Sequence, residues 1–592
     1  MGLTSLLNVS KQGIYVSQGT LQTISHNISN VNTPGYSRQS ATLENTSGDL
    51  NNPIGGGVKI SQITRQFDEL IQRREELGTA EIGRLESRER FLTMIEDVFN
   101  DLDGDGLSQR LDAFYTAADK LTDNPTNTVG REELVAEADA LARYMHDMNQ
   151  SLSELTMPVD QEINVVLEDI NVRLGALQRI NETIVSNENS HPALDLKDQR
   201  RKMILELGKI VDIRTFELPN DGIQVVTSKG QELLVDTSYS AQFKRSATTD
   251  ENGFLGIEVN GRDFGINDRI QGGNLKGLIE IRDEVLYGDK GYITRLESIA
   301  DEVRFQVNKV HAQTVNQTLY TSLTGIAELG SDLDSAVSSL VTDEKSANYV
   351  DSPVDLSRLE AAGGAITFAT GTSTDNLDTI ASVNITTSMS LREIKDAINN
   401  SGAVNASITT TGDKQYLKIE ATTGKVFGVV SDTSNVLAAL GVGGIFSGTG
   451  AKDMAVGADL LADSKLLGIG KLNSHGTNPP TTVTFDDGHS GGALALGDLR
   501  EAEFTLSGDS TTLAAHYARL VGELGSVIRQ DKESLLAQES AQKFISDLQE
   551  SVAGVSLEEE LTDLIRFQRS FQASSKMVGV ADELMQTIIS MV

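Results

Sequence analysis

Apolar residues near the N-terminus recur at alternating steps of four and three. With Ser10 and Ser17 filling two of the steps, the spacing continues for about four heptads. Lys11 is the only charged residue among the first 31, and the other polar positions are mostly Ser, Thr, Asn and Gln. A heptad pattern with so little charge predicts a helix that neighbours surround on several sides. The apolar members of this N-terminal seam are Leu3, Leu7, Ile14, Leu21, Ile24, Ile28 and Val31.

A second seam of the same kind reaches the C-terminus. Gly554 predicts the end of the preceding helix, and Ser556 is a suitable N-cap for the next one. Glu558 to Glu560 then fall in its first turn, where the helix dipole favours acidic residues. The apolar members of this C-terminal seam are Leu561, Leu564, Phe571, Val578, Met585 and Ile589. We predict that residues 1–64 and 553–592 form a terminal helical assembly domain whose seams contact other copies of the chain. Two helices of an intramolecular bundle are the alternative.

In the middle of the chain, the spacing of apolar residues changes from helical to strand-like and back to helical. Helical spacing in 65–212, 271–315 and 505–552 predicts a helical bundle domain, and period-two alternation in 213–270 predicts a β-rich domain. Residues 316–504 are rich in Gly, Ser, Thr and Asp, which predicts an outer inserted β/α domain. The expected fold class is therefore multidomain α+β, with a coiled-coil-like pair of terminal helices, a helical layer and β-rich domains inserted outward.

The insertion contains a short helix with a clear start signal. Ser390 and Glu393 have the spacing of a capping box, and Leu391, Ile394 and Ile398 share one helical face. Alternating apolar residues in 404–408 and 417–421 predict two strands after it. The region is expected to form a small βαββ unit.

Charge and composition exclude several functional classes. The 592 residues suggest about four domains, and 85 acidic against 50 basic residues give a net charge of −35. This charge argues against binding to nucleic acid or to an anionic membrane surface. The absence of Cys excludes disulfides and thiolate metal sites. No apolar run is long enough for a membrane span, and polar residues interrupt the start of the chain where a cleavable signal peptide would be apolar.

One acidic loop has the spacing of a calcium site. Asp101, Asp103, Asp105 and Asp112 occupy positions 1, 3, 5 and 12 of an EF-hand-like loop. The last position holds Asp, which is short for bidentate binding, and Ser108 stands where an apolar residue is usual. We therefore interpret the loop as an acidic turn between helices, and calcium as the weaker alternative.

The sequence offers no catalytic constellation. Thr484 to Gly488 resembles the aspartate motif of polysaccharide deacetylases, but His489 has no second His at metal-ligand spacing. The seven His residues are scattered, and no nucleotide-binding or nucleophile motif occurs in a strand–helix context. We predict no enzyme activity, no catalytic residue, no cofactor and no metal.

Several segments together resemble one protein family. Residues 28–38 resemble the N-terminal motif of bacterial flagellar rod, hook and hook-associated proteins. Residues 54–58, Asp198 to Arg200, and 554–574 resemble segments of the hook–filament junction members. The resemblance covers about 1–312 and 511–592. The motif residues are Asn30, Asn32, Thr33, Pro34, Gly35 and Tyr36.

This resemblance implies a structural subunit of the bacterial flagellum that joins hook to filament and assembles through its terminal helices. It implies export through the flagellar channel, without a cleaved signal peptide, to an extracellular location. The implied partners are further copies in a ring, the hook protein, the second junction protein (hook-associated protein 3) and an export chaperone at the C-terminal helix. No nucleic acid or membrane partner is expected.

The sequence is also compatible with two other kinds of protein. The chain could be another flagellar axial protein of the hook or distal rod, although such proteins lack the motif at Asp198 to Arg200. A secreted adhesin or hydrolase with a helical stalk would need a binding cluster in 316–504, and the sequence shows none. The 390–421 unit resembles modules in the outer domains of flagellins, with a generic α+β insertion as the alternative.

Overall fold

The computed structural model divides the chain into two compact units. Unit 1 comprises Met1–Phe91, Val159–Ile281 and Ile528–Val592, and unit 2 comprises Leu92–Pro158 and Arg282–Val527. The structure describes residues 3–46, 56–99, 106–187, 193–250, 252–265, 269–330, 332–337, 358–360, 362–476, 480–486, 488–506 and 508–591.

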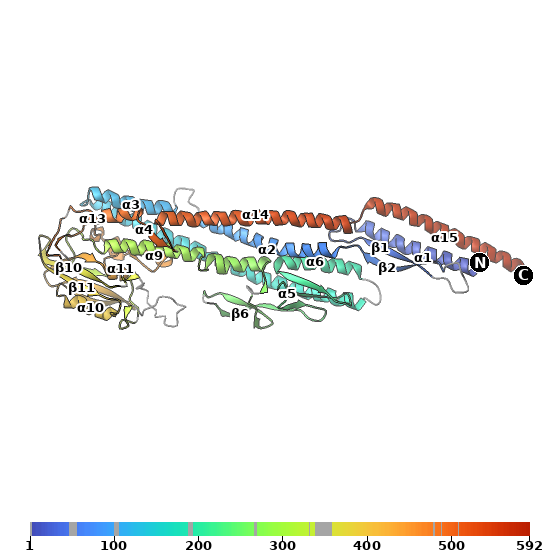
Figure 1. The fold of residues 1–592 in the computed structure, drawn as a ribbon, viewed down its shortest axis with the longest axis horizontal. Helices are drawn as coiled ribbons and strands as arrows, with labels where there is room; N and C mark the ends of the chain where they lie inside the picture. Colours follow the sequence, from blue (N-terminus) through green and yellow to red (C-terminus); the bar gives the residue numbers. More distant parts are fainter. Residues whose placement is uncertain are drawn as a thin grey trace. The chain divides into compact units, whose positions relative to one another are not determined.

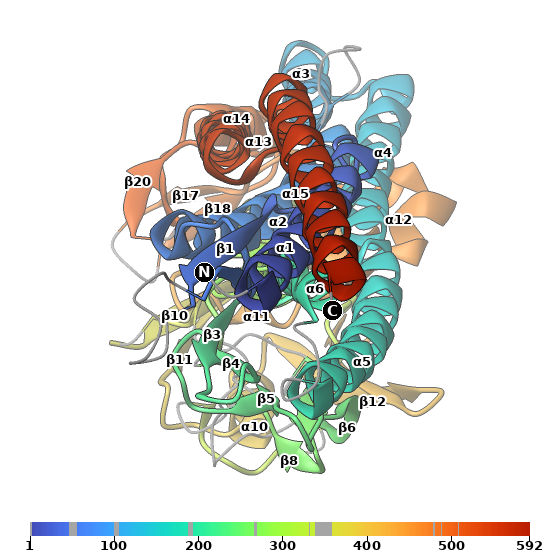
Figure 2. The same cartoon turned by 90° about the vertical axis from the view of Figure 1, so that its right-hand side faces the viewer.

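Long helices form most of unit 1, and Figures 1 and 2 show α1 and α15 side by side near both chain ends. The predicted stop after the N-terminal helix is confirmed, because the Tyr36 N–H donates to the Thr33 carbonyl and Gly35 has φ +80°. Glycine adopts that left-handed conformation without steric cost. The helices are α1 (Leu3–Ser29), α2 (Glu69–Val98), α5 (Thr156–Asn187), α6 (Leu194–Ile210), α8 (Asn274–Ile279), α14 (Leu513–Ala553) and α15 (Leu557–Met591), of which α2, α5 and α14 extend into the residues of unit 2.

The strands of unit 1 form antiparallel sheets. β1 (Gln39–Asn45) pairs with β2 (Val58–Arg65) in a hairpin. The β-rich segment forms two sheets of order β3-β4-β5 and β6-β7-β8. Their strands are β3 (Ile213–Glu217), β4 (Ile223–Thr227), β5 (Leu233–Val235), β6 (Phe243–Thr249), β7 (Leu255–Val259) and β8 (Arg262–Asp263), so the predicted change to period two is confirmed.

Asparagine side chains on helix α5 hold these sheets. The Asn181 amide donates to the Ile223 carbonyl at 2.8 Å and accepts from the Ile223 N–H at 2.9 Å. The Asn171 amide likewise donates to the Phe243 carbonyl at 2.8 Å and accepts from the Phe243 N–H at 2.7 Å. We call this arrangement, in which one side-chain amide bonds both backbone groups of one residue, a bidentate amide pair. It satisfies a strand's backbone groups that would otherwise be buried without partners.

Unit 2 combines helices with short antiparallel sheets. Its main sheets have the orders β11-β10-β14 and β12-β13-β9, and the pairs β15-β16, β17-β18 and β19-β20 are two-stranded. The helices are α3 (Leu107–Asp123), α4 (Thr128–Glu154), α9 (Tyr292–His311), α10 (Leu391–Asn400), α11 (Val436–Ala439), α12 (Ala458–Ala462) and α13 (Gly491–Gly497), with a π-helix at Glu280–Leu286 and 3-10 turns at Ala451–Asp453, Ser464–Leu466 and Asp498–Arg500. The strands are β9 (Ser322–Thr324), β10 (Gly364–Ser373), β11 (Asn376–Ile385), β12 (Val404–Thr411), β13 (Lys414–Ala421), β14 (Val426–Asp432), β15 (Phe446–Ser447), β16 (Ala455–Val456), β17 (Asn473–His475), β18 (Thr482–Thr484), β19 (Phe504–Leu506) and β20 (Asp509–Thr511).

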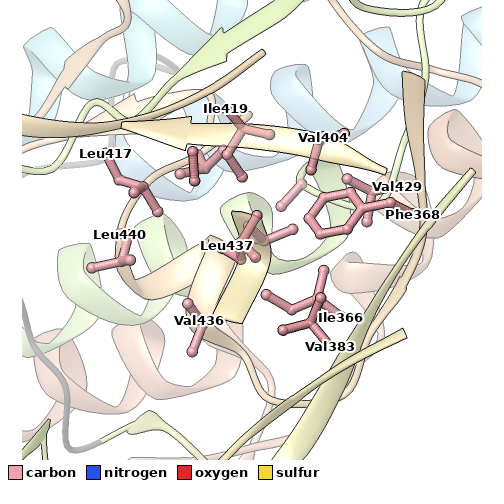
Figure 3. Packing of buried hydrophobic residues seen from close by; sticks show 14 of the residues in the cluster. Ile366, Phe368, Val383, Val404, Leu417, Ile419, Val429, Val436, Leu437 and Leu440 are labelled. Carbon is pink, nitrogen blue, oxygen red and sulfur yellow. The ribbon is translucent and has the colours of Figure 1, made fainter. Parts of the chain in front are cut away.

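The main core of unit 2 lies between these sheets and the short helices (Figure 3). The predicted capping box is confirmed, since Ser390 accepts from the Glu393 N–H and Glu393 accepts from the Ser390 N–H. The predicted apolar face of α10 is buried in this core, and Asn399 on the same helix forms a bidentate amide pair with Ala406. The core residues labelled in Figure 3 are Ile366, Phe368, Val383, Val404, Leu417, Ile419, Val429, Val436, Leu437 and Leu440.

The last part of the 316–504 segment packs against the helices of unit 2. Asn308 on α9 forms a bidentate amide pair with Phe446 and accepts a further bond from the Ile445 N–H. The rings of Phe114 and Phe446 lie 5.9 Å apart, and Arg131 on α4 donates to the Leu467 carbonyl. The predicted boundaries of the outer domain stay a prediction, and these contacts favour a boundary nearer to the end of β14.

Candidate functional site

The terminal helices α1 and α15 form an antiparallel pair. Asn27 at the end of α1 donates to Glu560 at the start of α15, and a Cβ added at Gly13 would lie 2.7 Å from the Ser574 hydroxyl oxygen. The buried side of α1 carries small polar residues, including Ser10 and Thr20, whose hydroxyls donate to carbonyls of their own helix. Such hydroxyls need no outside partner, which lets the two helices approach closely.

The residues of the two predicted seams differ in how far they are exposed to solvent. On α1, Ile24 is buried, whereas Leu3, Leu7, Ile14, Leu21 and Ile28 are half-buried, as is Val31 in the turn after the helix. On α15, Leu564, Phe571, Val578 and Met585 are half-buried, whereas Leu561 and Ile589 are 51% and 74% exposed. The pairing of α1 with α15 agrees with the intramolecular alternative. The role of these residues between copies stays a prediction.

Helix α15 also carries apolar residues outside its contact with α1. With 3.6 residues per turn, its exposed apolar residues, apart from Ile589 near the end of the helix, divide between the two opposite flanks of the face that meets α1. Leu557, Leu561 and Ile565 lie on one flank, and Met577, Val580, Leu584 and Ile588 lie on the other. All of them are at least 42% exposed. An isolated helix pair gains nothing from apolar residues on these flanks.

Residues of the 30–36 motif shape the end of α1. The Asn30 amide donates to the His26 carbonyl, Thr33 donates to Asn30, and Asn32, Pro34 and Gly35 are exposed. The Tyr36 hydroxyl donates to the Asn27 side chain at 2.8 Å, and burial together with nearby carboxylates raises the Tyr36 pKa. Asn27 in turn forms a bidentate amide pair with Gln39, at 2.8 and 3.0 Å. The motif therefore fixes the path from α1 into β1.

Buried ion pairs tie this turn to α6 and α15. Asp198 accepts from the Ser37 N–H at 3.0 Å, the Ser37 hydroxyl at 2.8 Å and the Arg65 guanidinium at 2.6 Å. Arg38 donates to Glu560 at 2.7 Å, and Glu560 is only 1% exposed. Sequence reasoning assigned Glu560 to the helix dipole and missed this role. The only signal in the sequence was a carboxylate four residues before Leu564, on the same side of the helix as that seam residue.

A groove of about 910 Å³ lies beside these pairs. Its walls are the end of α1 with residues 30–36, one side of α6 with Glu75 of α2, and the end of α14 with the link to α15. Lys202 on α6 lies in the groove and is exposed, and the neighbouring Arg201 forms a buried ion pair with Glu75. The groove is open on a polar surface, so it does not have the enclosed apolar form typical of a small-molecule site.

The candidate metal and catalytic positions form no site in the described residues. Asp101, Asp103 and Asp105 lie outside those residues, and Asp112 on α3 pairs with Arg500 at 3.3 Å. No group of three or more His, Cys, Asp or Glu side chains could hold a metal ion within the described ranges. The His489 ring accepts from the backbone N–H groups of Lys471 and Gly491. In the same ranges, no helix has the length and apolar character needed to cross a membrane.

Family models and relatives of known name both connect this chain with flagellar proteins. The model of the flagellar hook-associated protein FlgK helical domain matches residues 92–323, and the model of the flagellar basal body rod FlgEFG protein C-terminal region matches residues 550–591. The chain is 24% identical to the flagellar hook-associated protein 1 of Salmonella typhimurium, over 99% of this chain and 100% of that protein. It is 21% identical to the protein of the same name from Bacillus subtilis, over 99% of this chain and 97% of that protein.

A solved structure is also similar. The flagellar hook junction protein FlgK from Burkholderia pseudomallei aligns with a TM-score of 0.52 and 16% identity, covering 81% of this chain and 100% of that one. At this identity the similarity shows the fold alone. The predicted α+β class with paired terminal helices is thereby confirmed.

Proposed function

We propose, from the premise that this chain belongs to the flagellar hook-associated protein 1 family, that it is a structural subunit joining hook to filament through its terminal helices. The observation that carries the proposal is the placement of exposed apolar residues on two opposite flanks of α15. A helix that meets α1 on one face and a further neighbour on each flank fits a subunit enclosed by copies in a closed ring or tube.

The subunit needs partners in the flagellum and a route of export to reach them. The chain acts within the flagellar axial structure, with further copies, the hook protein and hook-associated protein 3 as neighbours. Before assembly, an export chaperone covers the flanks of α15, because a helix with this much exposed apolar surface needs a cover in solution. The subunit is exported without a cleaved signal peptide and acts outside the cell. It has no catalytic role.

A hook or distal-rod subunit is the second candidate. The match of residues 550–591 to a model of the C-terminal region of rod proteins favours it. The full-length relatives and the match over 92–323 favour the junction instead. Labelling the protein on purified flagella, with hook and filament both in view, separates the two candidates by position.

Replacing Leu584 by Asp tests the flank of α15. Leu584 is 46% exposed, so the monomer should fold like the wild type, with the same far-UV circular dichroism and urea midpoint. In the assembly a buried carboxylate costs several kcal/mol, so we expect hooks that release their filaments and cells that do not swim. The amount of the variant in the culture medium separates loss of export from loss of incorporation.

Leu461→Asp is the matched control, because Leu461 on α12 is 49% exposed but lies in unit 2. We expect it to swim like the wild type. Normal motility of the Leu584 variant would contradict the proposal.

A further inference from the structure

Side-chain amides in this protein repeatedly bind both backbone groups of a single residue. The bidentate amide pairs of Asn27, Asn171, Asn181, Asn308 and Asn399 all have this form, and each Asn stands on a helix while its partner lies in another segment. A side-chain amide matches the N–H and C=O of one extended residue in the same way that a neighbouring strand does.

Gln549 on α14 has a buried amide without such a partner. Its side chain is 8% exposed, and neither its Oε1 nor its Nε2 has a hydrogen-bond partner among the described residues. The amide nitrogens of two other glutamines on the same side of α14 do have partners: Gln542 donates to the Glu75 carbonyl at 3.3 Å, although its Oε1 is unpaired, and Gln538 donates to the Gly78 carbonyl at 3.5 Å. A buried amide with both groups unpaired is costly, so its retention points to a partner outside the chain.

The groove described above lies at this residue. Gln549 lines it, together with Asn30 to Tyr36 on one side and Ser546 and Ser556 on the other. The last torsion of a Gln side chain is broad, so either the oxygen or the nitrogen of the amide can face a given partner at little energetic cost. Hydroxyl and amide side chains on the walls offer further hydrogen bonds to a peptide backbone.

The position of the groove indicates its occupant. Its edge at Val555 and Ser556 leads directly into the exposed flank of α15 formed by Leu557, Leu561 and Ile565. In the proposed assembly that flank is covered by another copy of the chain, so the groove is the continuation of the same contact surface.

We propose that this groove binds an extended backbone segment of a second copy of the chain, one residue of which forms a bidentate amide pair with Gln549. The inference rests on the proposed function, because it needs copies that assemble side by side. It adds a specific polar contact, which fixes the register between neighbouring copies where apolar seams alone would permit sliding.

Gln549→Met tests the pair, since Met keeps the shape of the side chain and removes the amide. The isolated subunit should unfold at the same or a higher temperature, because two buried unpaired atoms are removed. Its incorporation at the end of the hook, in competition with wild-type subunits, should fall by about tenfold. Gln542→Met is the matched control, for which we expect wild-type incorporation. A lower melting temperature for Gln549→Met, or unchanged incorporation, would overturn the inference.

A crosslink identifies the occupant. The chain has no Cys, so Ser546→Cys gives a single thiol at the groove for a benzophenone maleimide. After irradiation of purified flagella, a product of twice the subunit mass should appear on a denaturing gel, and mass spectrometry of that product should find the label on a peptide of this chain. A label on another flagellar protein, or only within the same copy, would overturn the inference and leave the proposed function standing. Absence of wild-type subunits from the hook–filament junction would overturn both.

Discussion

Replacing Gly83 by alanine is expected to destabilise unit 1 by about 3 kcal/mol or more. A Cβ at this position of α2 would lie 1.9 Å from the Lys209 carbonyl oxygen and 3.1 Å from the Asn274 backbone nitrogen. Both neighbours are backbone atoms, so they cannot move aside as a side-chain end can. To admit the methyl group, α2 must separate from the end of α6 and the start of α8.

Urea unfolding followed by circular dichroism measures this effect, and hydrogen exchange of peptides spanning residues 205–215 locates it. Gly525→Ala is the control, because Gly525 is also inside a helix but nothing lies within 4 Å of its added Cβ. Alanine there should stabilise the protein by about 1 kcal/mol through helix propensity alone. Equal effects of the two substitutions would show that the close contact at Gly83 does not exist in solution.

The long elements could be predicted from the sequence because their signals are local. The N-terminal helix, the break at Gly554 and the Ser390–Glu393 capping box each depend on residues within a few turns, and each is confirmed. The period-two alternation after residue 213 is a local signal too. In these segments helix or strand propensity and the burial pattern agree, so tertiary contacts had no reason to override them.

The candidate site was harder to predict because it depends on residues far apart in the chain. Asn27 and Glu560 are separated by 533 positions, and no spacing rule connects them. The division of the α15 seam into a face toward α1 and two exposed flanks depends on where α1 packs. The bidentate amide pairs leave no periodic signature, since a single Asn on a helix reads as an ordinary polar residue. The close contact at Gly83 likewise depends on which backbone approaches it.

Acid is expected to destabilise unit 2 through His311. This residue of α9 is buried, and its Nε2 accepts from the Gly468 N–H at 2.9 Å. Nε2 is therefore unprotonated, and Nδ1 carries the hydrogen and donates to the Gly443 carbonyl. A second proton would have to enter at Nε2, facing another N–H group. Burial, with a smaller contribution from the nearby Arg131, lowers the pKa of His311 to about 4, although the bond to Gly443 opposes the shift.

The direction of the pH effect follows from this lowered pKa. Below about pH 6.5 the unfolded chain binds a proton at His311, whereas the folded chain stays neutral there until about pH 4. The stabilisation is therefore complete above pH 6.5 and is lost as the pH falls toward 4, by about 3 kcal/mol in total. Buried carboxyls such as Asp432, whose pKa is raised by desolvation, act in the opposite direction, so the wild-type curve alone does not isolate the His.

His311→Gln isolates it, because Gln can still donate and accept but does not titrate. Hydrogen exchange of peptides around Gly443 and Gly468 should show protection that falls between pH 6.5 and 4 in the wild type and changes much less in the variant. Subtracting the protection of the variant from that of the wild type at each pH removes the contribution of the carboxyls. A difference that does not vary with pH would mean that the folded chain binds the proton as readily as the unfolded one. In that case the Nδ1–H tautomer and its bonds to the 443–468 segment would not hold α9 to that segment.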